Sequence, residues 1–129
     1  MPRPQKSPPI FEEITYTLIG MGYVIHKELG SAHKEHVYQR ALEEELKIHD
    51  IGHVREPHLQ VKFKDKPVGI YVPDFLIDGK VILELKALSD LPLSAGTQLN
   101  YYLKTTGYRV GLLLNFGTRR LQICRRIYG

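Results

Sequence analysis

The feature that most constrains this chain is an apolar run interrupted by one acid and one base. Residues 81–87 read Val-Ile-Leu-Glu-Leu-Lys-Ala, which predicts a short and largely buried strand. Because side chains alternate between the two faces of a strand, Glu84 and Lys86 are expected on one face and the leucines on the other. An unpaired buried charge is costly, so these two side chains must pair, ionise differently or hold a metal.

A second acid lies in the preceding apolar run. Residues 68–77 predict a strand that contains Asp74, and Asp78-Gly79 is a tight hairpin signal before the next strand. If the register brings Asp74 beside Glu84, the two carboxylates repel and cannot both ionise freely without a cation. Oxygen ligands of this kind suit Mg²⁺ or Mn²⁺ rather than zinc. Lys86 could then orient a water or neutralise charge on phosphorus; a structural Glu–Lys pair is the alternative.

The elements around this pair predict one α/β domain without internal repeats. The expected order is helix, helix, three strands, helix, two strands. Helices are expected at residues 10–29, 32–50 and 95–106, the last with a Ser94 cap, and strands at residues 59–64, 68–77, 81–87, 108–115 and 119–127. The Pro-rich residues 1–9 predict a flexible tail before a single domain at residues 10–129.

Charge and cysteine content narrow the function classes. The net charge of +4 and the pI near 9.2 favour a polyanionic partner without requiring one. Cys124 is the single cysteine, so an internal disulfide is excluded and a reducing, cytoplasmic location is expected. No apolar run reaches the length of a membrane span.

Polar pairs on two predicted helices are further candidates. Gln98 and Tyr102 are four residues apart, and Glu35 and Tyr38 are three apart, so each pair shares a helix face. Each could reach the site formed by the acids, although taken alone each is more typical of an ordinary helix surface. The arginines in residues 119–126 could contact backbone phosphates or protect an edge strand.

In order along the chain, these residues resemble the PD-(D/E)XK nuclease superfamily. The resemblance rests on Pro73-Asp74, on Glu84-Leu85-Lys86, and on Gln98 with Tyr102, as in the RecB-like branch. Over about residues 10–128 the chain is similar to the small GxxExxY proteins of that superfamily. Ala32 stands where those proteins have the glycine that names them, and an alanine there would be strained only if its φ were positive.

The resemblance implies a restriction-endonuclease-like fold, a mixed β-sheet flanked by helices in the order ααβββαββ. It also implies a magnesium-dependent phosphodiesterase that acts on DNA, with Mn²⁺ able to replace Mg²⁺. Carried over by position, the metal ligands would be Asp74, Glu84, the Leu85 carbonyl and Glu35, with Lys86 as the catalytic lysine and Gln98 and Tyr102 as supporting residues.

Two other readings remain open at this point. The chain could be a non-catalytic module that keeps the nuclease fold in order to bind nucleic acid or protein. It could also act as a homodimer on branched DNA, because small nucleases often engage two strands through a two-fold partner.

Overall fold

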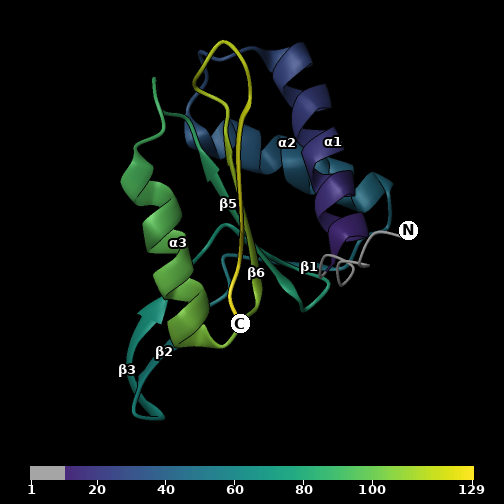
Figure 1. Cartoon of the computed structure of the whole chain (residues 1–129). Coiled ribbons are helices and arrows are strands. Elements are labelled where there is room, and N and C mark those ends of the chain that lie inside the picture. The colour runs from purple at the N-terminus through teal and green to yellow at the C-terminus, as the bar shows by residue number, and fades with distance from the viewer. Residues whose placement is uncertain (1–10) are drawn as a thin grey trace, which may run out of the picture.

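Two helices begin the part of the chain that the computed structural model describes, residues 11–129. They are α1 (Glu12–Leu29) and α2 (Glu35–Ile48), which cross one face of the sheet (Figure 1). Both are shorter than expected: α1 begins at Glu12 rather than at residue 10, and α2 begins three residues after Ala32 and ends before Asp50. The predicted tail at residues 1–9, and Ile10, lie outside the described residues.

A five-stranded mixed sheet forms the centre of the domain. Its spatial order is β1-β4-β5-β6-β7, in which β5 and β6 are parallel and all other neighbours are antiparallel. The strands are β1 (His53–Arg55), β4 (Phe75–Ile77), β5 (Val81–Lys86), β6 (Val110–Asn115) and β7 (Gln122–Ile127). Helix α3 (Leu93–Thr106) connects the two parallel strands, as a parallel pair requires. Hence α3 covers the face opposite α1 and α2.

The predicted strand at residues 68–77 is in fact two strands in different sheets. The first part is β3 (Lys66–Tyr71), which pairs with β2 (Leu59–Phe63) in a separate two-stranded sheet. The second part is β4 of the central sheet. Pro73 lies at the break, and a proline cannot donate a backbone hydrogen bond to a sheet. With the short β1 also unpredicted, the described chain contains seven strands in the order ααβββββαββ, while the restriction-endonuclease-like mixed α/β class is confirmed.

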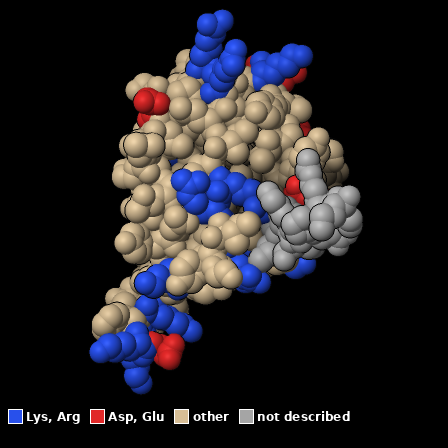
Figure 2. Space-filling view, in the orientation of Figure 1, with Lys and Arg blue, Asp and Glu red and all other residues tan. Residues whose placement is uncertain are grey.

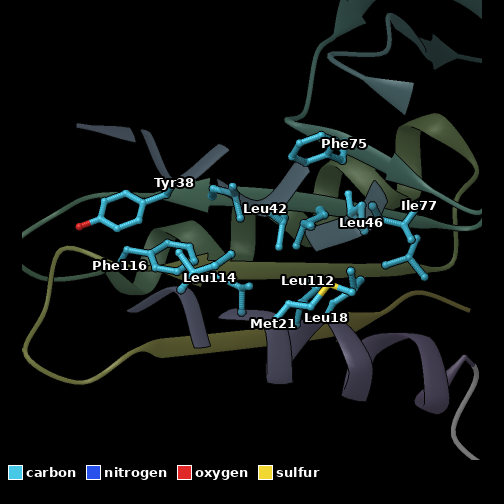
Figure 3. Close-up of a cluster of buried hydrophobic side chains, with 14 of the residues drawn as sticks. Leu18, Met21, Tyr38, Leu42, Leu46, Phe75, Ile77, Leu112, Leu114 and Phe116 are labelled. Atoms are coloured by element: carbon cyan, nitrogen blue, oxygen red, sulfur yellow. The ribbon is translucent and has the colours of Figure 1, made fainter. Parts of the chain in front are cut away.

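The core follows the two faces of β5. Figure 3 shows the larger cluster, where α1 and α2 side chains pack against alternate residues of β4, β5 and β6. There Tyr38 stacks on Phe116 with ring centroids 4.5 Å apart. On the other face Ile82 joins a second cluster under α3. The near-continuous apolar sequence of β5 reflects this burial on both faces.

The ends of α3 give one wrong and one confirmed prediction. Ser94 does not cap the helix, because the helix begins at Leu93 and Pro92 occupies the cap position without a side-chain hydrogen bond. At the other end the helix stops at Thr106, as expected, and Gly107 adopts φ 86°, a left-handed conformation that glycine accepts with little strain. None of the helices within residues 11–129 has the length and apolar character needed to cross a bilayer.

Candidate active site

The β4–β5 hairpin sets the position of the two central acids. Asp78 and Gly79 have φ values of 52° and 65°, the positive values that a type I′ hairpin turn requires. The strands on either side of this turn, β4 and β5, pair Phe75 with Leu83. One further step in the same register places Asp74, just before β4, opposite Glu84. Asp74 and Glu84 therefore lie next to each other, as the sequence predicts.

Asp74 is held in place by two hydrogen bonds. Its Oδ2 accepts the Leu85 backbone N–H at 2.7 Å, and its Oδ1 accepts Nε2 of Gln39 at 3.0 Å. Burial raises the pKa of Asp74 above its usual value, while the hydrogen bond from Leu85 and the charge of Lys86 oppose that increase. The carboxyl group is thus fixed between α2 and β5.

Glu84 and Lys86 lie on the shared face that the alternation of β5 predicts. Both are only partly buried, and Glu84 Oε2 lies 3.7 Å from Lys86 Nζ. Burial and, to a smaller extent, the nearby charge of Asp74 raise the pKa of Glu84 to about 7, against the opposing effect of Lys86. Two carboxylates thus face each other in a partly dehydrated place, where each makes ionisation of the other less favourable.

Two tyrosines and a glutamine form the wall beside Glu84. The rings of Tyr71 and Tyr102 stack with centroids 3.7 Å apart and planes at 3°, and Gln98 Nε2 lies 3.5 Å from the Tyr102 hydroxyl. A small depression is lined by these side chains together with Glu84 and Lys86. The predicted pair on α3 therefore lines the same depression as Glu84.

The buried Tyr71 hydroxyl is close enough to Glu84 to affect its pKa. Within residues 11–129, however, that hydroxyl makes no hydrogen bond of good geometry. The Tyr71 hydroxyl therefore lies near the Glu84 carboxylate without a well-formed hydrogen bond to that group.

Glu35 lies at the edge of this arrangement. It is the first residue of α2 and is exposed on its outer side, yet partial burial and the charge of Asp74 both raise its pKa, while Lys86 lowers it. Within residues 11–129 no three His, Cys, Asp or Glu side chains form a group tight enough to hold a metal. Ala32 does not have a positive φ, so the alanine at the family's glycine position is unstrained.

Three residues of the site were absent from the sequence-based prediction. Gln39 donates to Asp74 and lies 3.4 Å from Glu56. Glu56 also donates its backbone N–H to the Asp74 carbonyl at 2.8 Å. Tyr71 is the third. The available signal for Gln39 was its place one turn after Glu35 on α2, because an amide on that face needs a polar partner.

Asn115 is a further residue that the sequence did not single out. It is fully buried at the end of β6, in register with Lys86. Its Oδ1 accepts the Leu88 N–H at 2.8 Å, and its Nδ2 donates to the Leu88 carbonyl at 3.0 Å and to Gln122 at 2.8 Å. Asn115 thereby fixes the segment that leaves β5 immediately after the lysine.

Comparison with known proteins agrees with this architecture. The chain is similar in fold to the protein in the crystal structure of SSO0001, with a TM-score of 0.52 and 19% sequence identity. That match covers 91% of this chain and 57% of the other, so the chain spans little more than half of its length. No curated protein matches. A family model of the PD-(D/E)XK nuclease superfamily matches residues 12–127, nearly the whole chain, and the protein therefore belongs to the PD-(D/E)XK nuclease superfamily.

Proposed function

We propose that this protein is a divalent-metal-dependent nuclease that hydrolyses phosphodiester bonds of DNA. The observation that carries the proposal is the facing pair Asp74 and Glu84, both with raised pKa values, beside Lys86. Membership of a nuclease superfamily supports the same chemistry. A folded protein rarely keeps two like charges in such a place without a counter-charge or a catalytic use.

The donor set fits a hard cation. Each oxygen of Asp74 accepts one hydrogen bond, which leaves further lone pairs free. With Glu84 and the Leu85 carbonyl, all the proposed ligands are oxygens, as Mg²⁺ and Mn²⁺ prefer. We assign Glu35 an outer role, through a water molecule, because it is exposed and the described residues contain no three-acid group. When bound, the cation would polarise the phosphate and acidify a water.

The side chains around the acids then have separate tasks. Lys86 brings a positive charge to the place where negative charge builds on the phosphoryl oxygens. Gln39 and the Leu85 N–H keep the Asp74 carboxylate oriented. The stacked Tyr71 and Tyr102 restrict how far Glu84 can turn.

A non-catalytic binding module is the second candidate, and one observation favours it. Glu84 and Lys86 already lie 3.7 Å apart, a distance at which they can neutralise each other without a metal. On this reading the pair is structural, and the protein binds nucleic acid or protein without cleaving it.

Three finer proposals accompany the main one. We infer that the chain is one of the GxxExxY proteins, which is supported by Glu35, Tyr38 and the residues around Glu84. We infer a cytoplasmic location from the single buried thiol of Cys124. We also infer that the protein acts as a homodimer on two strands of branched DNA. Sedimentation velocity with and without such DNA tests this proposal.

Calorimetric titration of Mn²⁺ into the purified protein tests the metal site directly. We expect saturable binding that is lost in Asp74→Asn and Glu84→Gln and kept in Glu28→Gln, an exposed acid on α1. The titration is repeated with a non-cleavable oligonucleotide, since nucleic acid can supply part of the metal shell. Equal binding by all variants in both titrations would support the binding module.

Cleavage assays then separate the two candidates. Labelled single-stranded, duplex and branched DNA are incubated with Mg²⁺ and with the wild type, Lys86→Ala or Glu28→Gln. We expect cleavage by the wild type and the Glu28 variant, and a loss of about a hundredfold or more without the lysine. Labelled RNA is incubated in the same way. If the protein binds metal and cleaves the RNA but none of the DNA substrates, the DNA assignment is refuted.

A further inference from the structure

The two-stranded sheet of β2 and β3 projects from the domain as an arm. Figure 1 shows this hairpin extending below α3, beyond the elements of the central sheet. Only its base is buried, where Leu59 and Tyr71 pack with Leu99 and Leu103 of α3. Every residue from 62 to 70 is exposed. The arm is thus anchored at one end and contributes little to the core along most of its length.

The end of this arm carries a concentration of positive charge. Residues 62–66 read Lys-Phe-Lys-Asp-Lys, with a net charge of +2 out of +4 for the whole chain. Figure 2 shows Lys and Arg atoms gathered on the projecting part, where Figure 1 places β2 and β3. Within residues 11–129 none of these three lysines forms an ion pair, and Lys64 Nζ lies 5.5 Å from the centroid of the Phe63 ring.

An apolar ring lies among these charges. Phe63 is 63% exposed at the end of β2, next to the turn. Lys64 and Asp65 form that turn with φ values of 49° and 62°, so the hairpin closes with a two-residue loop and stays narrow to its end. A narrow two-stranded ribbon with a lysine on each strand, a third in the turn and an aromatic ring near its tip has the dimensions to enter the major groove of B-form DNA.

The arm is directly connected to the candidate active site. β3 ends at Tyr71, which lines the depression beside Glu84, and Asp74 follows three residues later. At roughly 3.3 Å per residue, Lys66 lies about 17 Å along the strand from Tyr71. The tip of the arm and the two acids are therefore close enough together for one duplex to contact both.

We propose that the β2–β3 hairpin is a DNA-binding arm that enters the major groove beside the scissile phosphate, with Lys62, Lys64 and Lys66 on backbone phosphates and Phe63 against base edges. This inference rests on the proposed function, and it assigns the substrate to duplex DNA. In A-form RNA the major groove is too deep and narrow for protein side chains to read. A second copy of this chain is a poorer occupant, because two such arms would bring six lysines together.

Binding measurements without chemistry test the arm. Fluorescence anisotropy of a labelled duplex in EDTA gives Kd at several salt concentrations for the wild type, for Lys62→Gln with Lys66→Gln, and for Lys47→Gln with Lys80→Gln. The last pair makes the same change in net charge away from the arm. We expect the arm variant to bind about tenfold more weakly and to lose about 1.8 from the slope of log K against log salt, at 0.9 per phosphate contact.

Phe63→Ala tests the apolar part separately. It is expected to weaken binding several-fold without changing the salt slope, because an aromatic contact with base edges releases no counterions. Duplex RNA of the same sequence is expected to bind more weakly than the DNA, and equally well to wild type and arm variants.

The outcomes distinguish this inference from the proposed nuclease function. If the arm and control variants have equal affinities and salt slopes, the β2–β3 hairpin is not a DNA-binding arm, whether or not the protein cleaves DNA. The absence of any DNA binding would refute the inference in the same way. An arm effect of the same size on duplex RNA would also overturn the groove assignment. Sedimentation that shows a dimer dissociated by the arm substitutions would identify the arm as an interface between copies. DNA binding through the arm without cleavage would leave the arm standing and refute the nuclease.

Discussion

Replacing Glu84 by glutamine should stabilise the metal-free protein at high pH. The glutamine keeps the shape of a protonated glutamate and removes the charge that burial and Asp74 disfavour. The pKa of Glu84 is about 7, compared with 4.5 for the free side chain. Between these two pH values the folded state retains a proton that the unfolded state has lost, so wild-type stability falls as pH rises through this window.

The size of the effect follows from the shift. A difference of about 2.5 pKa units corresponds to about 3 kcal/mol, or roughly 10 °C in melting temperature for a domain of this length. At about pH 4 both proteins are neutral at this position and should have similar free energies of unfolding. Above about pH 8 the variant should be the more stable one by nearly the full amount.

Urea denaturation in EDTA, repeated from acidic to alkaline pH, measures the difference. Glu28→Gln is the control, and its difference from the wild type should stay constant with pH. A Glu84→Gln variant that is less stable than the wild type above pH 7 would contradict this prediction. That result would mean that the pair with Lys86, at 3.7 Å, outweighs the cost of burial. Without EDTA, added Mn²⁺ should stabilise the wild type and Glu28→Gln but not Glu84→Gln, by mass action on the folded state.

Three other substitutions test the surroundings of the acids by urea denaturation or calorimetry. Tyr71→Phe should leave the free energy of unfolding unchanged or raise it, because the stacked ring is kept and the buried hydroxyl lacks a well-formed hydrogen bond; a loss above about 1 kcal/mol would contradict this. Asn115→Ala should cost about 2–4 kcal/mol, since the fully buried Asn115 amide is the partner of both the Leu88 N–H and the Leu88 C=O; an unchanged midpoint would refute that role. Gly117→Ala should lower the melting temperature by several degrees, because the new Cβ would overlap the backbone of residues 87 and 88; an unchanged melting temperature would show that this segment can move aside.

Several features of the site could be predicted from local sequence. The alternation of side chains in β5 predicted that Glu84 and Lys86 share a face. The Asp78-Gly79 turn predicted that the preceding strand pairs antiparallel with β5. The helical spacing of Gln98 and Tyr102 gave their common side. All these signals depend on backbone periods and turn geometry, which involve residues close together in the chain.

Other features depended on contacts that no local pattern reports. The separation of β3 from β4 required knowing that β3 pairs with β2 and packs on α3 while β4 joins the central sheet. Pro73 signalled the break but not which sheet each side would join. In the same way, Gln39 is an ordinary helical glutamine in the sequence and becomes a support of Asp74 only when α2 lies against β5.

The sequence by itself therefore determined the class of the domain, the strand that carries Glu84 and Lys86, and the acid that faces them. Only the tertiary structure decided that Asp74 is fixed from α2, that Glu35 lies at the edge of the site, and that β2 and β3 form a projecting arm. The physical reason is that side-chain alternation and turns are set by neighbouring residues, whereas burial and hydrogen bonding depend on which distant segments pack together.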